Sequence, residues 1–413
     1  MPNAELESDG KRPAKDKDKG LARTNRHAVV VSARGSARIR AGHVWVYRSD
    51  VAHTEALAPG ALTAVKDNTG KLLGTALYSS ASQIALRMWS DGLVDAQEFT
   101  HLLRSRIAAA IDLRRSLVRD SDAYRVVFSE ADFLPGLIVD RYGDLLCLQV
   151  LTQAMDQAGV RATVMASLLE ELQPAAVVER VDARIRELEQ LPPRETGLLH
   201  GERSSTIFTM NGVRFQYDAA AGQKTGAFLD QRENYAAAAR YARGEALDVF
   251  CYQGGFALHL AACEPITGVD SSRAALEVAE QNAALNGKQI QWMEANAFDL
   301  LKDYATAGRQ YDTIVLDPPA FAKSRRSLET AMRGYKELNL RALKMLRPGG
   351  TLVTCSCSYH VSESEFLRVV AAAAVDARRR VRLLETRTQA IDHPILLTVP
   401  ETRYLKCVIT RAD

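Results

Sequence analysis

Two cysteines near the carboxyl end of the chain have the chemistry and the setting of a nucleophile. Cys355 and Cys357 lie in Thr351-Leu-Val-Thr-Cys-Ser-Cys-Ser358, which predicts a buried strand followed by its exit. A thiolate that adds to carbon 6 of a pyrimidine moves electron density to carbon 5, which can then accept a methyl group. Residues two apart in an extended strand face the same side, so both thiols are candidates. Because a buried cysteine is more often an inert apolar side chain, the surroundings must decide.

An acid and an aromatic ring flank two prolines at the end of an earlier predicted strand. The strand runs over residues 311–316, and Asp317-Pro-Pro-Ala-Phe321 follows it. Proline fixes φ and lacks an N–H, so this run predicts a rigid wall whose carbonyl groups face a pocket. Asp317 could stabilise charge that develops on a planar base, and Phe321 could stack on that base. A strand ending in an ordinary turn would explain Pro318 and Pro319, but not the residues that flank them.

A glycine-rich turn and a second acid predict a site for an adenosine-bearing cofactor. The strand over residues 246–250 ends in Cys251-Tyr-Gln-Gly-Gly-Phe256, where glycines let the backbone approach a ligand closely. Asp270 ends the next strand, where a carboxylate can accept hydrogen bonds from ribose hydroxyls. The turn lacks the Gly-x-Gly-x-x-Gly spacing, so a dinucleotide is disfavoured. After the third strand, Asn296 is the candidate for reading the adenine edge.

Strands and helices alternate from about residue 245, which predicts a parallel α/β sheet. In such a sheet, ligands bind outside the carboxyl ends of the strands. We therefore expect the exits of the first, second, fourth and fifth strands to meet in one crevice. Cys357 and Asp317 should then lie on the same side of the sheet. A base in structured RNA would have to leave its stack to enter this crevice.

The first part of the chain predicts a tail and a small β-barrel. Residues 1–26 are rich in charge and poor in aliphatic side chains, which is typical of a disordered tail. Short strands and turns follow, and three arginines precede an aromatic pair. Arginines suit phosphate contacts and aromatic rings stack on bases, although a solvated loop beside core aromatics is the alternative. The candidates for RNA contact in this part are Arg34, Arg38, Arg40 and Trp45.

Composition excludes several classes of protein. The chain has 413 residues and a formal net charge of only +3, so an RNA partner needs a local basic face. No apolar run is long enough to span a bilayer, and no export signal precedes the first domain, so we expect a cytoplasmic protein without a membrane partner. The six cysteines include no Cys-x-x-Cys pair, so no metal site is predicted and reduced thiols are expected.

Several segments resemble the RlmI-type family of 23S ribosomal RNA cytosine-5 methyltransferases. Their order matches nearly everything after the tail, and the segments are Arg38–Tyr47, Asp132–Tyr142, Lys224–Arg232, Asp248–Phe256, Asp317–Lys323 and Ser356–Ser358. The resemblance implies a PUA-like RNA-binding β-barrel over residues 27–97 and a small α+β central domain over 98–212. It also implies a Rossmann-like, seven-stranded class I methyltransferase domain over 213–413, for which the cofactor is S-adenosylmethionine.

By this resemblance, Cys357 in its Ser-Cys-Ser context is the attacking thiol and Asp317 assists it, with Cys355 as the alternative. The Lys224–Arg232 stretch helps to close the cofactor pocket. The chain departs from the family at Asn296, where aspartate is common. The expected cofactor contacts are Phe228, Gln231, Asp248, Tyr252, Gly254, Gly255, Phe256, Asp270, Asn296, Ala297 and Asp317. The expected RNA contacts near the reacting base are Pro318, Pro319, Phe321 and Lys323.

The expected partner is 23S ribosomal RNA or a precursor of the large subunit, and the sequence also allows a homodimer. Two other functions fit parts of the sequence. A methyltransferase acting on a base nitrogen would need the Asp-Pro-Pro-Ala-Phe segment, and both cysteines would be structural. An RNA-binding assembly factor would hold S-adenosylmethionine without turnover, although the full set of Asp270, Asp317 and Cys357 argues for activity.

Overall fold

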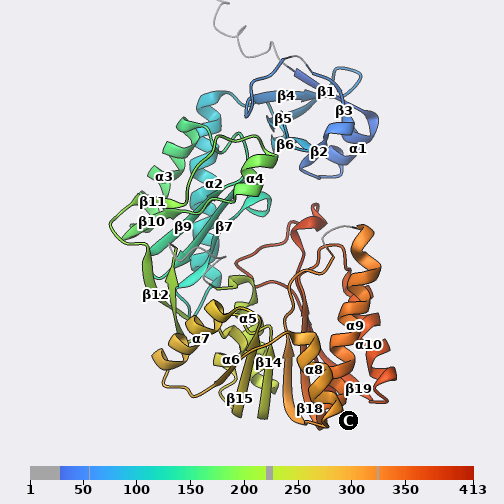
Figure 1. Ribbon diagram of the computed structural model, residues 1–413. Helices are drawn as coiled ribbons and strands as arrows, with labels where there is room; N and C mark the ends of the chain where they lie inside the picture. Colours follow the sequence, from blue (N-terminus) through green and yellow to red (C-terminus); the bar gives the residue numbers. More distant parts are fainter. Residues whose placement is uncertain (1–27, 55, 220–226, 323–324) are drawn as a thin grey trace, which may run out of the picture.

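The computed structural model describes residues 28–54, 56–219, 227–322 and 325–413, so the predicted tail over residues 1–26 lies outside the described residues. Three units follow one another along the molecule in Figure 1. An amino-terminal sheet lies at the top of the view, a sheet with two long helices lies below it, and a layered α/β unit forms the base. Within the described ranges, no helix has both the length and the apolar character needed to cross a membrane.

The amino-terminal unit is a six-stranded sheet around an apolar core of valines and leucines. The sheet order is β2-β6-β5-β4-β1-β3, with bounds Ala28–Val31, Trp45–Tyr47, Val51–His53, Leu62–Lys66, Leu72–Tyr78 and Ile84–Ser90 for β1 to β6. The expectation of strands and turns alone was wrong in one place, because α1 (Ala33–Arg40) is a helix. Ser32 begins this helix by accepting a hydrogen bond from the Gly35 amide, a local cap that apolar periodicity does not reveal.

The central unit is a five-stranded sheet covered by two helices, which agrees with the expected small α+β fold of this region. The sheet order is β11-β10-β9-β8-β7, with bounds Ala123–Phe128, Leu137–Tyr142, Leu145–Val150, Ala176–Glu179 and Gly197–His200 for β7 to β11. The helices are α2 (Ala96–Leu117) and α3 (Ala158–Leu172), with the short α4 (Ala183–Leu188) beside them. Apolar side chains of α2 at three- and four-residue spacing pack onto the sheet, which explains why the helix forms there.

A β-hairpin joins the central unit to the α/β unit. Strands β12 (Ser205–Met210) and β13 (Val213–Asp218) pair antiparallel with Met210 opposite Val213. The turn residues Asn211 and Gly212 both have positive φ, 49° and 79°, as a two-residue hairpin turn requires. Asn-Gly between two runs rich in β-branched and aromatic residues is a strong sequence signal for such a hairpin.

The third unit is a seven-stranded sheet in the order β16-β15-β14-β17-β18-β20-β19. All neighbouring strands are parallel except β20, which runs antiparallel to β18 and β19. The bounds of β14 to β20 are Gly244–Val249, Cys263–Asp270, Gln291–Glu294, Tyr311–Leu316, Leu346–Ser356, Val381–Arg387 and Lys406–Ala412. Helices α5 to α10 are Arg232–Tyr241, Gly255–His259, Arg273–Leu285, Ala297–Thr306, Leu328–Met345 and Glu363–Asp376. The expected α/β fold is confirmed.

The order of this sheet explains where its site lies. The chain leaves β14 toward β15 on one side, whereas β17 pairs with β14 on the other side. The direction of winding therefore reverses between β14 and β17, and a crevice opens at the carboxyl ends of these strands. Helices α5 to α7 cover one face and α8 to α10 cover the other, each over its own apolar cluster (Figure 1).

Buried charges tie the central unit to the last unit. Asp392 accepts hydrogen bonds from the guanidinium of Arg232 and from the backbone amide of Arg125, both at 2.8 Å. Its own carbonyl accepts from Arg114 at 2.8 Å. These contacts hold the segment before β20 against the central sheet. They also fix the region around residues 228–232, which faces the crevice.

Candidate active site

The turn after β14 is shaped to approach a ligand. Phe250 and Tyr252 have positive φ of 66° and 49°, which non-glycine residues rarely adopt and which recurs at ligand sites. Gly254 follows with φ of 84°. A Cβ added to Gly255 would lie 2.5 Å from the Tyr235 hydroxyl oxygen, so only glycine fits there. The structure therefore confirms the close backbone turn predicted from the sequence.

Two carboxylates hold this turn in place. Asp270 ends β15, and its oxygens accept from the amides of Tyr252 and Ser272, both at 2.9 Å. Asp248 is fully buried in β14, and one oxygen accepts from the Ala257 amide at 2.9 Å. Its other oxygen has no hydrogen-bond partner among the described residues. Burial, with a smaller contribution from Asp270, raises the pKa of Asp248 to about 7.

A cavity beside the turn is lined by five of the eleven residues that were predicted to contact the cofactor. Phe228, Tyr252, Gly255, Phe256 and Asp317 all line it. The rings of Phe228 and Tyr252 lie 5.1 Å apart, a spacing that suits aromatic walls. The remaining lining residues are Met210, Phe215, Ala227, Tyr235, Phe250, Cys251 and Gln253. The apolar walls, the unpartnered Asp248 oxygen and the glycine turn fit an adenosine-bearing cofactor.

Asp317 lies where β17 ends and keeps some exposed surface toward the crevice. Gln231 donates to its carboxylate at 3.0 Å, and Asn234 in turn donates to the Gln231 amide oxygen at 2.7 Å. Surrounding protein removes most of its hydration, and this raises the pKa of Asp317 to about 8, with added repulsion from Asp230 and Asp248. This raised pKa allows the carboxyl group to hold a proton and donate a hydrogen bond near neutral pH.

The two candidate thiols have different environments. Cys355 lies inside β18, opposite Cys407 of β20, and none of its surface is exposed. Cys357 follows the strand and is partly exposed at the crevice. Its thiol lies 3.9 Å from the carbonyl oxygen of Pro318 and donates toward it. The structure thus brings Cys357 and the Asp317-Pro318 turn together, on the same side of the sheet, as expected.

The serines on either side of Cys357 anchor its loop, which the sequence did not reveal. The Ser356 hydroxyl donates to the Tyr335 hydroxyl at 2.9 Å, and the Ser358 hydroxyl lies 2.9 Å from the same oxygen. Ser358 also accepts from the Ala322 amide at 3.1 Å, which joins the loops after β18 and β17. Because both serines are buried against α9, Cys357 between them is turned to the crevice.

Other predicted site residues have structural contacts of their own. Asn296 is the N-cap of α8 and accepts from the amides of Phe298 and Asp299, and Ala297 is buried behind it. Phe321 packs on Tyr335 and Phe298 with ring centroids 4.8 and 5.9 Å away. Pro319 is exposed at the wall and Pro318 is buried. Lys323, which was expected to contact RNA, lies outside the described residues, as does part of the Lys224–Arg232 stretch.

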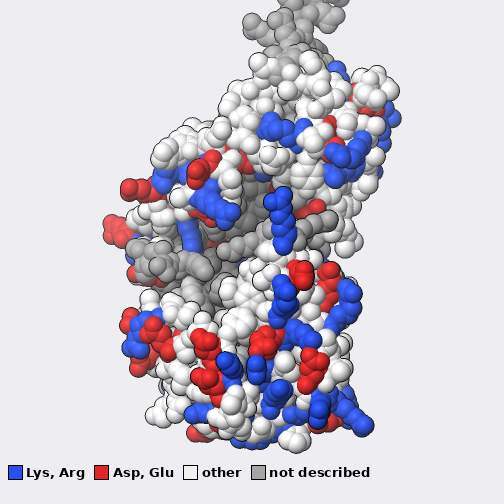
Figure 2. Space-filling view, turned by 45° about the vertical axis from the view of Figure 1, so that its right-hand side comes forward, with Lys and Arg blue, Asp and Glu red and all other residues white. Residues whose placement is uncertain are grey.

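The predicted RNA-binding arginines lie together on and beside α1. Arg34 pairs with Asp50 at 2.6 Å, and Arg40 forms an ion pair with Asp67. Arg38 lies over the Tyr47 ring, with its guanidinium carbon 4.6 Å from the ring centroid. Figure 2 shows Lys and Arg side chains on this upper unit and around the hollow below it. A local basic face is therefore present despite the small net charge of the chain.

Trp45 contacts the next unit, because its indole N–H donates to Glu130 at 3.0 Å.

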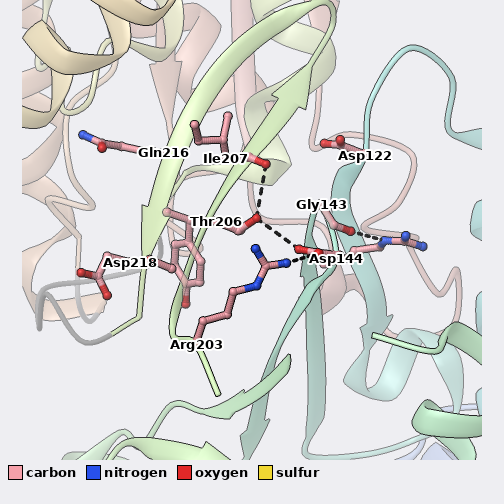
Figure 3. Close-up of a pocket in the computed structure, with 11 residues that line it drawn as sticks. Asp122, Gly143, Asp144, Arg203, Thr206, Ile207, Gln216 and Asp218 are labelled. Atoms are coloured by element: carbon pink, nitrogen blue, oxygen red, sulfur yellow. Dashed lines mark hydrogen bonds and ion pairs between the residues drawn. The ribbon is translucent and has the colours of Figure 1, made fainter. Parts of the chain in front are cut away.

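A second hollow lies away from the crevice, between the hairpin and the central sheet (Figure 3). Arg203 and Thr206 both contact Asp144 there, and none of the predicted catalytic or cofactor residues lines it. The lining residues are Asp122, Arg141, Gly143, Asp144, Arg203, Ser205, Thr206, Ile207, Gln216, Tyr217 and Asp218. This hollow carries no catalytic constellation that we can identify.

Two family models match the chain. A PUA-like domain model covers residues 29–91, and an S-adenosylmethionine-dependent methyltransferase model covers residues 160–393, which begins inside the expected central domain. Among solved structures, an S-adenosylmethionine-dependent methyltransferase from Streptococcus mutans superposes with a TM-score of 0.78 at 18% identity, covering 93% of this chain and 99% of that one. A structure described as a methyltransferase complexed with SAH gives a TM-score of 0.80, also at 18% identity. These structures share the fold.

Two named relatives are more similar to this chain in sequence than these solved structures are. Ribosomal RNA large subunit methyltransferase I of Shewanella amazonensis is 40% identical over 381 residues, which cover 89% of this chain and 95% of that protein. The protein of the same name from Erwinia tasmaniensis is 38% identical over 378 residues, with 88% and 94% covered. The fold and the site define an S-adenosylmethionine-dependent methyltransferase of class I with a PUA-like domain. The chain belongs to the ribosomal RNA large subunit methyltransferase I family.

Proposed function

We propose that the protein transfers a methyl group from S-adenosylmethionine to carbon 5 of a cytosine in 23S ribosomal RNA, with Cys357 as the nucleophile. The names of its relatives support ribosomal RNA of the large subunit as the substrate. The observation that carries the mechanism is the position of the Cys357 thiol, 3.9 Å from the Pro318 carbonyl oxygen beside Asp317. A thiol on the floor of the methyl-transfer crevice suits attack on a ring that carries no good nucleophile of its own.

In this mechanism, the sulfur of Cys357 forms a bond to carbon 6 of the cytosine. The π electrons of the ring move toward carbon 5, which then attacks the methyl group. Transfer of the carbon-5 proton to solvent at the open side of the crevice restores the double bond and expels the sulfur as a thiolate. Splitting one hard step into easier covalent steps is the general advantage of a nucleophilic enzyme residue.

Asp317 assists from the wall of the crevice. Because burial raises its pKa to about 8, the carboxyl group can hold a proton near neutral pH. It can then donate a hydrogen bond to the edge of the base, where negative charge grows as sulfur adds. Gln231 holds this carboxyl group in place at 3.0 Å. A preoriented donor in a partly dehydrated site stabilises such charge more strongly than water does.

S-adenosylmethionine supplies an electrophilic methyl group on a sulfonium. Asp270 would accept hydrogen bonds from its ribose hydroxyls, because this carboxylate is already held at the exit of β15 by two amides. The turn at Gly254 and Gly255 lets the backbone lie close to the ligand. Phe228 and Tyr252 would form aromatic walls of the pocket. The role of Asn296 in adenine recognition stays a prediction, since its side-chain oxygen already caps α8.

Burial supports Cys357 over Cys355 as the nucleophile. Cys355 has no exposed surface and packs with Cys407 in the apolar cluster that α5 covers, so a ring cannot approach its sulfur without displacing this cover. Cys357 is partly exposed, and its loop is held by the flanking serines.

The basic face of the PUA-like domain would hold the RNA backbone while the target base enters the crevice. We place the expected RNA contacts on Arg34, Arg38 and Arg40. Trp45 has its indole N–H engaged with Glu130, so it would offer only its ring face. A cytoplasmic location follows from a ribosomal RNA substrate, and the homodimer and the division into domains at residues 27–97, 98–212 and 213–413 stay predictions.

The matched pair Cys357→Ala and Cys355→Ala tests this function. Each variant is assayed for transfer of tritium from methyl-labelled S-adenosylmethionine to large-subunit ribosomal RNA, followed by nucleoside analysis. We expect Cys357→Ala to lose about 10³-fold or more in rate and Cys355→Ala to keep most activity. Full activity of Cys357→Ala with a methylated ring or exocyclic nitrogen would favour the non-covalent alternative. Wild-type protein that binds the cofactor but transfers nothing would favour an assembly factor.

A further inference from the structure

The connection between β19 and β20 touches the amino-terminal unit. It spans residues 388–405 and rises in red from the α/β unit toward the amino-terminal unit in Figure 1. A Cβ added to Gly42 would lie 2.8 Å from the methyl carbon of Thr398, so Thr398 packs directly on this glycine. The Glu401 carboxylate lies 3.2 Å from Nε2 of His43. Because Gly42 and His43 closely follow α1, the upper end of the connection lies beside the arginines that are expected to bind RNA.

The lower end of the same connection reaches the catalytic crevice. The Tyr404 hydroxyl donates to Asp230 at 2.6 Å, in the short helical turn that also carries Gln231. Lys406 is the first residue after the connection, and its ammonium donates to the carbonyl oxygen of Ser358 at 2.6 Å. This serine directly follows the proposed nucleophile. The connection therefore extends from the end of α1 to the crevice.

A leucine projects from the turn at the upper end. Leu397 is 91% exposed, the largest exposed fraction among the large apolar side chains that the structure describes. The Val399 amide donates to the Leu396 carbonyl at 2.8 Å, and the Thr402 hydroxyl accepts from the Leu396 amide at 2.9 Å. Val399 and Thr402 are themselves buried. A single exposed leucine is ordinary on a protein surface. This one, however, stands on a turn that is already ordered, so little conformational entropy is lost when it binds.

Basic side chains flank this turn. Arg40 at the end of α1 has 51% of its side chain exposed, and Arg403 has 49% exposed beside its ion-pair partner Glu363. The Glu401 carboxylate in the same connection is matched by His43. An apolar tip between exposed cations suits a polyanion with stacked bases. It suits the core of a protein interface less well, because charged residues are depleted there.

We propose that Leu397 is an apolar wedge, which enters the base stack of the RNA beside the target nucleotide and holds the target base out of that stack. A base that enters an enzyme pocket must first be unstacked, and this costs free energy. Leucine is among the side chains that nucleic-acid-binding proteins insert between bases. The wedge lies between the end of α1, where phosphates are expected, and the crevice, where the base is expected. The inference rests on the proposed function, because it requires that a base enters this crevice.

Two substitutions at position 397 separate the shape of the side chain from its presence. Leu397→Ala removes the wedge, whereas Leu397→Met keeps an apolar side chain of similar reach. The control is Val375→Ala, because Val375 is 75% exposed and lies in the last turn of α10, roughly 18 Å along the helix from Glu363. Thermal unfolding is recorded for each variant, and we expect small shifts since the substituted side chains are exposed.

Methyl transfer to large-subunit ribosomal RNA is measured in single turnovers at saturating RNA. We expect the rate constant of Leu397→Ala to fall about tenfold or more, because a base that returns to its stack is not in place to react. Leu397→Met and Val375→Ala should stay within about threefold of wild type. The Kd for RNA should also change less than about threefold, since phosphate contacts supply most of the affinity. Weaker RNA binding of Leu397→Ala with an unchanged rate constant would overturn the inference, because it would indicate binding alone.

Photo-cross-linking locates the side chain directly. The variant Leu397→p-benzoylphenylalanine is irradiated in complex with the RNA, and the cross-linked nucleotide is mapped by reverse transcription. We expect the cross-link in the nucleotides that adjoin the methylated one. A cross-link to a distant part of the RNA, or to a second copy of the protein, would overturn the inference.

Failure of the wedge and failure of the proposed function give different results. A cross-link beside the methylated base together with a fully active Cys357→Ala variant would refute the covalent mechanism and leave the wedge intact. A Leu397→Ala variant as fast as wild type together with an inactive Cys357→Ala variant would refute the wedge alone. Wild-type protein that transfers no methyl group would refute both.

Discussion

The thiol of Cys357 lies 3.9 Å from the carbonyl oxygen of Pro318, across the ends of two neighbouring parallel strands. One strand ends in Asp317-Pro318 and the other in Ser356-Cys357-Ser358, so the pairing of β17 with β18 fixes this relationship. The Pro318 and Pro319 nitrogens carry no hydrogen, so this turn offers carbonyl acceptors and no amide donors at these two positions. The proposed nucleophile and the proposed acid are thus placed together by strand register and not by a flexible loop.

Removing the Tyr335 hydroxyl should weaken catalysis without weakening cofactor binding. The hydroxyl lies 2.9 Å from both Ser356 and Ser358, and the ring is fully buried. In Tyr335→Phe both serines lose a partner, which should lower stability by about 1–3 kcal/mol. The looser loop should lower kcat by roughly 10- to 100-fold, because small misplacements of a nucleophile are costly. Single-turnover rates and calorimetric binding of S-adenosylmethionine check this, and unchanged kcat would show that the serines do not orient Cys357.

Because of Asp317, the free energy of unfolding of the cofactor-free protein should fall as pH rises. Its pKa is raised to about 8, whereas an unfolded aspartate has a pKa of about 4, so the folded state binds the proton more tightly. By linkage, stability is lost between about pH 4 and pH 8 and levels off above that window. The difference in Tm between Asp317→Asn and wild type should therefore become more positive from pH 5 to about pH 8. The exposed Asp303→Asn variant is the control, and a difference independent of pH would contradict the assignment.

Asp270 should contribute to cofactor binding in two ways. It holds the amides of Tyr252 and Ser272 at 2.9 Å, and it is placed to accept from the ribose. We expect Asp270→Ala to raise the Kd for S-adenosylmethionine by roughly 10- to 100-fold, since hydrogen bonds to charged groups contribute about 1.5–3 kcal/mol. Isothermal titration measures the effect against Glu280→Gln, an exposed acid on the following helix. A Kd equal to that of wild type would place the ribose elsewhere.

The arginines of α1 should contribute to RNA affinity through ionic contacts that weaken as the salt concentration rises. Arg34 and Arg40 are largely exposed even though each has an acidic neighbour. If both bind phosphates, the double variant Arg34→Gln, Arg40→Gln should reduce the slope of log affinity against log salt by about 1 for each arginine that neutralised a phosphate. Filter binding at several salt concentrations tests this, with the exposed Arg104→Gln on α2 as the control. An unchanged slope would show that RNA lies on another face.

The sequence was sufficient to predict the parts of the site that depend on strand order. Alternating strands and helices placed Asp270, Asp317 and Cys357 at one edge of a sheet, and the structure agrees. Residues that act through side-chain contacts across the fold were not predicted. Tyr335 comes from the middle of a helix, where the apolar spacing indicates a core residue and does not reveal its contact with the loop after β18. The role of Asn296 in adenine recognition stays a prediction, and the sequence did not reveal that its side-chain oxygen caps α8.

The covalent adduct itself is the most direct test. Large-subunit ribosomal RNA substituted with 5-fluorocytidine has no proton to lose at carbon 5, so the step that releases the sulfur is blocked after methyl transfer. We predict a stable protein–RNA adduct that forms only with S-adenosylmethionine, with the nucleotide on the peptide that contains Cys357 in mass spectra after digestion. Catalytic methylation of the unsubstituted RNA without any trapped adduct, or an adduct on Cys355, would contradict the account.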